Sequence, residues 1–274
     1  MTLQLRSPRF LIISEPRTGS NNIAYVLDAH PDLEVGNELL HPVNGIKITD
    51  FPELDLPALE NVKAEHGREY HWLAGVTSAQ RHAVCQTLFA KYNGFKIHSQ
   101  HLPAAVIREL AEDFGCSVIV TTRIDIFGQA LSNFIAEHIG RWHADDRPHG
   151  AAGSLTVRPM RMVNWLNDMT SARADLWLAL RGGTAPVFVC QYEVFFSGTQ
   201  TERIGRFLML LDFLGVTRFG KLEPEAMEVA FKKVLHYVDP TKQKMNDQDS
   251  AQRQVTNYHE LRARYEVWTM ASYA

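Results

Sequence analysis

This sequence contains few cysteines, and it has neither long apolar runs nor a large excess of one charge. The 274 residues include three cysteines, Cys85, Cys116 and Cys190, and no two of them form a CxxC pair. Their wide spacing argues against a disulfide framework and against a cysteine zinc site. We therefore expect reduced thiols. Cys116 and Cys190 border or lie within apolar runs, so we expect these two to act as small buried hydrophobic groups.

Apolar runs of membrane-spanning length, roughly 20 residues, do not occur. The run at residues 10–13 is also too short for a signal-peptide core. The formal net charge of −3 argues against a broad basic face for nucleic acid or an anionic membrane, because such binding depends on clustered Lys and Arg. We expect a cytoplasmic protein without nucleic-acid partners or a membrane span, in which any phosphate site is local.

Short apolar segments with strand composition alternate with helical patterns. This order predicts an α/β fold with a central parallel sheet flanked by helices, because parallel strands need crossover connections. We expect a single domain over residues 1–274, with ligands at the carboxyl ends of the strands. The expected strands are residues 10–14, 94–98, 116–122 and 186–192; the expected helices are about 22–29, 104–114, 127–135 and 204–214; irregular acceptor loops are expected at 44–57 and 141–159.

The segment after the first strand has the composition of an anion-binding loop, Pro16-Arg17-Thr18-Gly19-Ser20-Asn21-Asn22. Backbone N–H groups and the helix dipole favour an anion before the following helix. Gly19 permits close approach of the backbone, and Arg17 supplies a charged fork for phosphate or sulfate oxygens. The alternative is an ordinary capped helix start. The Gly-Lys-Ser/Thr of a Walker A loop is missing, which disfavours a typical kinase or ATPase.

Two segments carry a resemblance to PAPS-dependent sulfotransferases (PAPS, 3′-phosphoadenosine-5′-phosphosulfate). Residues 15–22 resemble their 5′-phosphosulfate loop, with Asn21 where threonine is frequent. Residues 123–132, RIDIFGQALS, resemble their 3′-phosphate motif, in a form closest to bacterial trehalose 2-sulfotransferase-like carbohydrate sulfotransferases. Weaker resemblances lie at residues 35–40, 94–98, 191–193 and 213–216, so the nucleotide-binding elements are expected at about 10–30, 94–135 and 186–216.

This resemblance implies a P-loop NTPase-like sulfotransferase fold and in-line transfer of a sulfuryl group from PAPS, without a metal. The product would be the desulfated nucleotide PAP. The partner would be a small-molecule or glycan acceptor, and the hydroxyl that receives the sulfuryl group would belong to a carbohydrate or glycolipid. Arg17 and Lys96 would stabilise charge, Glu38 ranks first as the general base, His98 ranks second, and His101 stays open. The nucleotide-binding residues implied are Arg17, Thr18, Gly19, Ser20, Asn21, Asn22, Arg123, Ser132 and Tyr192.

Several alternatives stay open at this point. Arg123 can instead form a surface ion pair with Asp125, and histidines near strand ends are more often structural than catalytic. The cluster His138, His143 and His149 lacks a HExxH pattern, so we expect no metal there. Rival functions are a magnesium-dependent phosphotransferase with a degenerate phosphate loop and a non-catalytic nucleotide-binding protein. Lys242 and Lys244 are candidates for a C-terminal nucleotide contact, and homo-oligomerisation is left open.

Overall fold

A computed structural model describes residues 4–54, 56, 60–63, 69–140, 154–216 and 254–272. The contacts group the chain into two compact units, which we describe separately. Unit 1 comprises Met1–Thr122 and Ala172–Val238, and unit 2 comprises Arg123–Ser171 and Asp239–Ala274. The expectation of a single domain over residues 1–274 stays a prediction.

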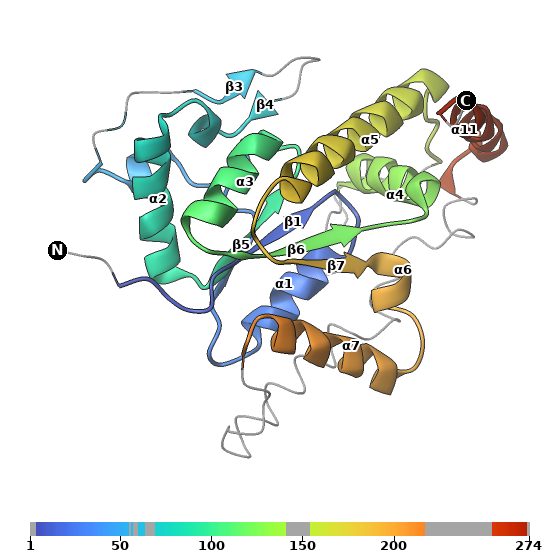
Figure 1. Ribbon diagram of the computed structural model, residues 1–274. Helices are drawn as coiled ribbons and strands as arrows, with labels where there is room; N and C mark the ends of the chain where they lie inside the picture. The colour runs from blue at the N-terminus through green and yellow to red at the C-terminus, as the bar shows by residue number, and fades with distance from the viewer. Residues whose placement is uncertain are drawn as a thin grey trace. The chain divides into compact units, whose positions relative to one another are not determined.

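The described elements alternate between strand and helix along much of the chain, as labelled in Figure 1. The strands are β1 (Phe10–Ser14), β2 (Val35–Gly36), β3 (Val62–Lys63), β4 (Glu69–Tyr70), β5 (Gly94–His98), β6 (Ser117–Thr122) and β7 (Val187–Gln191). The helices are α1 (Ser20–Asp28), α2 (Ser78–Lys91), α3 (Ala104–Asp113), α4 (Ile126–Ile139), α5 (Pro159–Arg181), α6 (Tyr192–Phe195), α7 (Gln200–Phe213) and α11 (Tyr258–Ser272), with short 3-10 turns η1 (Ile48–Asp50) and η3 (Trp72–Ala74).

Unit 1 is built on a five-stranded sheet in the order β2-β5-β1-β6-β7. Every pair in it is parallel, so the predicted α/β fold with a central parallel sheet flanked by helices is confirmed. The register aligns Ser14 at the end of β1 with His98 of β5 and Thr121 of β6. Three polar side chains therefore meet at the carboxyl edge of the sheet, where ligands of such folds bind.

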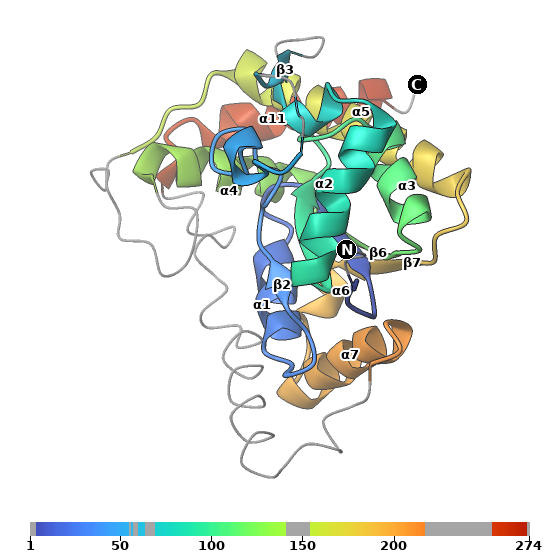
Figure 2. The ribbon, with the colours of Figure 1, turned by 90° about the vertical axis from the view of Figure 1, so that its left-hand side faces the viewer.

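The two faces of β1 bury alternate residues against different helices. Leu11 and Ile13 join a core with α2 and α3, whereas Phe10 and Ile12 join a core with α1 and α7. Figure 1 shows α2 and α3 on one side of the sheet and α1 and α7 on the other, and Figure 2 shows the same separation from a second direction. Each of these four side chains is fully buried and contributes about 1.5–3 kcal/mol. β1 is therefore the middle strand of the sheet and is buried on both faces.

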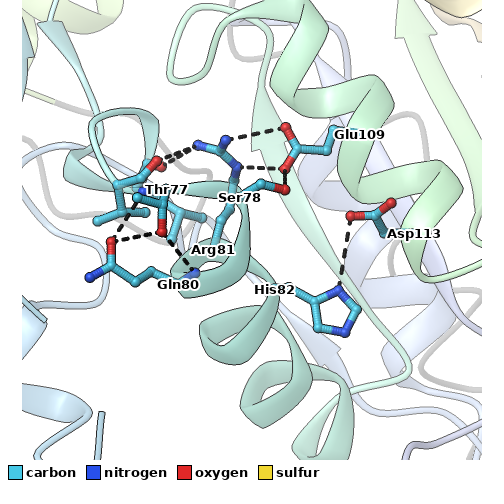
Figure 3. Close-up of polar contacts among 9 residues, drawn as sticks. Thr77, Ser78, Gln80, Arg81, His82, Glu109 and Asp113 are labelled. Atoms are coloured by element: carbon cyan, nitrogen blue, oxygen red, sulfur yellow. Dashed lines mark hydrogen bonds and ion pairs between the residues drawn. The ribbon is translucent and has the colours of Figure 1, made fainter. Parts of the chain in front are cut away.

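Polar contacts tie α2 to α3 (Figure 3). Arg81 of α2 is buried and donates from Nε and Nη2 to the two carboxylate oxygens of Glu109 in α3, at 3.0 and 3.2 Å. Its Nη1 donates to the carbonyl of Leu73 in η3 at 2.9 Å. At the start of α2, Thr77 and Gln80 form a capping box. This cluster holds η3 in place, and the backbone N–H of His71 beside η3 donates to the carbonyl of His101 at 2.9 Å.

Unit 2 pairs α4 with the C-terminal helix α11. The ring of Phe127 in α4 lies 5.5 Å from the ring of Tyr258 and 5.2 Å from that of Tyr265. Buried Leu131 and Leu261 belong to the same core. Among the described residues, the helices are all too short or too polar to cross a membrane.

The three cysteines lie in unit 1 as buried free thiols. The burial predicted for Cys116 and Cys190 from their apolar surroundings is confirmed, and Cys85 is buried as well. Burial raises the pKa of Cys116 to about 12 and raises the pKa of Cys85 and Cys190 further. At neutral pH they are protonated and act as small hydrophobic groups.

Candidate functional site

The loop between β1 and α1 has an unusual backbone path. Arg17 has φ of 64° and Gly19 has φ of 75°, so two left-handed residues flank Thr18. The Thr18 hydroxyl is buried and donates to the carbonyl of Glu15 at 2.8 Å, and it lies 2.7 Å from the hydroxyl of Thr121 in β6. These contacts fix the loop against the carboxyl edge of the sheet.

Helix α1 begins at Ser20, two residues earlier than the sequence predicts, so Ser20, Asn21 and Asn22 form its first turn. Its N-cap is Gly19, which has no side chain and makes no capping hydrogen bond. The ordinary capped helix start that the sequence left open is therefore not what forms. A helix start without a side-chain cap directs its first N–H groups toward whatever lies before it, which suits an anion.

Aromatic side chains cover the other side of Gly19. A Cβ atom placed on Gly19 would lie 2.6 Å from Cε2 of Phe196 and 2.9 Å from Cδ2 of Tyr192. The sequence predicts a role for Tyr192 in nucleotide binding, and the structure brings it to the loop. Glycine is needed here both for its positive φ and for this close approach.

A buried ion pair anchors the first residue of the loop. Arg173 of α5 donates to both carboxylate oxygens of Glu15, at 2.6 and 2.5 Å. The Glu15 side chain is almost completely buried and that of Arg173 is partly buried. Arg173 has no sequence signal as a site residue, because the two residues are 158 positions apart and no local pattern marks their pairing.

Strand β5 contributes two site residues from one face. Lys96 and His98 are alternate residues, and the register aligns them with Ile12 and Ser14 of β1, which face α1. The Lys96 side chain is 1% exposed. Its Nζ donates to Oε1 of Glu38 at 2.6 Å and also to Oδ1 of Asn21 in the first turn of α1. The structure thus brings together Asn21, Lys96 and Glu38, which the sequence named separately.

Glu38 follows the short strand β2 (Val35–Gly36) by two residues and has φ of 49°. A positive φ in a non-glycine residue is uncommon and is found more often at functional sites. The Glu38 side chain is 28% exposed, whereas that of His98 is 13% exposed. Glu38 is therefore the more accessible of the two candidate bases.

His98 is held by hydrogen bonds at both ring nitrogens. Nε2 lies 3.1 Å from Oε1 of Glu38, and Nδ1 lies 3.1 Å from the hydroxyl of Ser14. An ionised carboxylate can only accept, so Nε2 carries the proton and Nδ1 accepts from Ser14. In this arrangement His98 has no nitrogen left for an acceptor proton, and it orients Glu38 instead.

The charges of these groups depend on one another. Burial by itself would raise the pKa of Glu38, but the hydrogen bond from His98 and the charge of Lys96 hold that pKa well below its usual range. Burial lowers the pKa of Lys96, an effect that the Glu38 carboxylate partly offsets. Burial also lowers the pKa of His98. At neutral pH the site therefore contains an ionised Glu38 and a neutral His98.

Two further histidines lie beside His98. The ring centroid of His101 is 4.9 Å from that of His98 and 4.7 Å from that of His41. Burial, followed by the charges of His98 and His41, lowers the pKa of His101 to about 2. The ring of His101 is therefore neutral at neutral pH. The ranking of Glu38 ahead of His98 and His101 as the base stays a prediction. Across the residues that the structure describes, no group of three or more His, Cys, Asp or Glu is arranged to hold a metal ion.

Comparisons with known proteins identify no family. No protein-family model matches the chain, and no curated protein matches it. Among solved structures, the chain is similar to mouse sulfotransferase SULT7A1 complexed with PAP, at 13% identity and a TM-score of 0.46, over 97% of this chain and 84% of that one. At this identity and TM-score the likeness carries no argument about function.

In unit 2, Arg123 follows β6 directly and Ser132 lies in the second turn of α4, in the predicted order. Nη2 of Arg123 is 3.9 Å from the carboxylate of Asp125, the ion pair that the sequence left open as an alternative. Asp125 also caps α4 by accepting from the N–H of Gly128 at 2.8 Å. Convergence of Arg123 and Ser132 on one phosphate stays a prediction.

Parts of several predictions lie outside the described residues. These are residues 55 and 57 of the predicted loop 44–57, residues 141–153 of the loop 141–159, two members of the predicted histidine cluster, His143 and His149, and the candidate contacts Lys242 and Lys244.

Proposed function

We propose that this chain transfers a sulfuryl group from PAPS to an acceptor hydroxyl, on a carbohydrate or glycolipid. One observation carries the proposal. The ammonium of Lys96 lies within hydrogen-bond distance of both the first turn of α1 and Glu38. The proposed anion-binding loop, the ammonium of Lys96 and the accessible carboxylate of Glu38 are thus neighbours. Sulfuryl transfer to a hydroxyl uses three groups of this kind.

In this proposal the residues divide the chemistry as follows. Glu38 takes the proton of the acceptor hydroxyl while the acceptor oxygen forms a bond to sulfur. The bond between sulfur and the 5′-phosphate oxygen breaks, and its electron pair leaves with PAP. Arg17, Lys96 and the N–H groups at the start of α1 stabilise the charge on the moving group and on the leaving phosphate. Rate enhancement comes mainly from positioning and electrostatics.

The carboxylates near the loop argue against the rival magnesium-dependent phosphotransferase. Glu15 is held by Arg173, and Glu38 is held by Lys96 and His98. A magnesium site usually offers one or two carboxylates together with substrate phosphates. A Walker A loop binds magnesium through a Ser or Thr hydroxyl, whereas the Thr18 hydroxyl of this loop donates to a backbone carbonyl. These pairings favour transfer without a metal.

The testing experiment compares ligands by thermal denaturation. We expect PAP to raise the melting temperature without magnesium, because a ligand at about 100 times its Kd stabilises the native state by roughly 2.7 kcal/mol. Stabilisation by Mg-ATP but not by PAP would refute the proposal in favour of a phosphotransferase. PAP binding without sulfate transfer from PAPS to any of a panel of sugars and glycolipids would favour the non-catalytic nucleotide-binding protein. The glycan acceptor and the cytoplasmic location also stay predictions.

A further inference from the structure

Lys96 is a buried cation whose charge is shared between two parts of the site. Its ammonium donates to Asn21, the second residue of α1, and to the carboxylate of Glu38 at 2.6 Å. A buried ammonium requires a counter-charge, because its transfer out of water is costly. Among the described residues that contact Nζ, only Glu38 is charged, so it supplies this counter-charge.

An anion bound before α1 changes this balance. A phosphate at the start of the helix would lie next to Asn21 and therefore next to Nζ of Lys96. One ammonium would then face two anions, the phosphate and the Glu38 carboxylate. The phosphate carries more charge and offers more acceptor oxygens, so it is the stronger partner.

We propose that Lys96 couples nucleotide binding to the base: bound nucleotide draws the ammonium away from Glu38, and the carboxylate becomes ready to accept a proton only when the donor is in place. This inference rests on the proposed function. It assigns Lys96 a role besides charge stabilisation, as the group through which the donor site controls the acceptor site.

The remaining contacts of Glu38 support this coupling. The titratable groups facing it from β5 are Lys96 and His98, with His101 and His41 beyond His98. Lys96 and His98 together lower the pKa of Glu38 in the empty site. When Lys96 turns to the phosphate, the pKa of Glu38 rises, while His98, fixed by Ser14, keeps the carboxylate in position.

A double-mutant cycle tests the competition directly. PAP affinity is measured by isothermal titration calorimetry for the wild type, Glu38→Gln, Lys96→Met and the double variant. We expect Glu38→Gln to tighten PAP binding by about five- to twentyfold, because Lys96 no longer has to leave a carboxylate. In the Lys96→Met background the same substitution should change PAP affinity little.

The matched control is Glu34→Gln, at an exposed carboxylate just before β2 that makes no contact with Lys96 in the structure. It should leave PAP affinity unchanged. Equal tightening by Glu38→Gln with and without Lys96 would show simple charge repulsion and would overturn the inference. Weaker PAP binding by Glu38→Gln would also overturn it, because Glu38 would then hold Lys96 in place for the nucleotide.

A second measurement needs no Lys96 variant, in case Lys96→Met fails to fold. Calorimetry at a series of acidic pH values, in two buffers of different ionisation enthalpy, gives the protons taken up on PAP binding. At a pH between the pKa values of Glu38 without and with PAP, the wild type takes up more protons than Glu38→Gln. Equal uptake at every pH of the series would overturn the inference alone, whereas failure of PAP to bind the wild type would overturn the proposed function and the inference with it.

Discussion

Replacing Gly19 with alanine should destabilise the protein by two separable effects. The residue has φ of 75°, and left-handed backbone costs an L-residue about 1–2 kcal/mol. The new Cβ would also lie 2.6 Å from Phe196 and 2.9 Å from Tyr192, and crowding of this kind costs about 1–3 kcal/mol. We expect a total loss of about 2–5 kcal/mol in the free energy of unfolding, measured by urea denaturation.

Two other glycines provide matched controls. Gly215 has φ of 68° but would place a Cβ in open space, so Gly215→Ala isolates the backbone cost of about 1–2 kcal/mol. Gly205 lies within α7 and is also unobstructed, so Gly205→Ala should stabilise the protein by about 0.5–1 kcal/mol. Equal losses for Gly19→Ala and Gly215→Ala would refute the argument, because the aromatic contact would then contribute nothing. Phe196→Leu should recover part of the loss caused by Gly19→Ala.

Three further predictions concern the site and its surroundings. Glu38→Gln should lower kcat by about 10² to 10⁴ while PAP still binds, and near-normal turnover would exclude Glu38 as the base. Arg123→Ala should weaken PAP by about 1.5–3 kcal/mol but adenosine 5′-phosphate far less, and equal losses would remove Arg123 from the 3′-phosphate. Burial lowers the pKa of His71 from 6.5 to about 4. Between pH 6.5 and pH 4, the unfolded chain therefore binds a proton at His71 that the folded chain does not bind. Stability should therefore fall by about 3 kcal/mol as the pH drops from 6.5 to 4, and His71→Gln should flatten that slope in urea denaturation.

The sequence predicts the local elements of the sheet well, because apolar composition and turn residues act over short distances. The expected strands correspond to β1, β5, β6 and β7, and the helix predicted at about 104–114 is α3. The strand order in the sheet depends on pairing between distant segments and could not be predicted from composition. Val189 is exposed because β7 is the last strand of the sheet. The edge position of β7 follows from the strand order and not from its apolar composition.

The candidate site was predicted residue by residue but not as an assembly. Lys96, His98 and Glu38 were each named from the sequence, and alternation along β5 explains why two of them share a face. The hydrogen bonds that join them, and the contact from Ser14 to His98, arise only when β1, β2 and β5 are adjacent. The positive φ of Glu38 likewise has no sequence signal, because non-glycine residues adopt it under tertiary constraint.

The ion pair between Glu15 and Arg173 bears on how the chain acquires its site. The two residues are 158 positions apart, so their contact closes a very long loop, and such closure is entropically costly. During folding, β1 and α1 can form early from local contacts, and the contact between Thr18 and Thr121 can hold the loop once β6 pairs with β1. The buried carboxylate of Glu15 gains its ion pair only after Arg173 of α5 is in place. A growing chain that ends before residue 173 should therefore contain the phosphate loop in its sequence and yet bind nucleotide poorly.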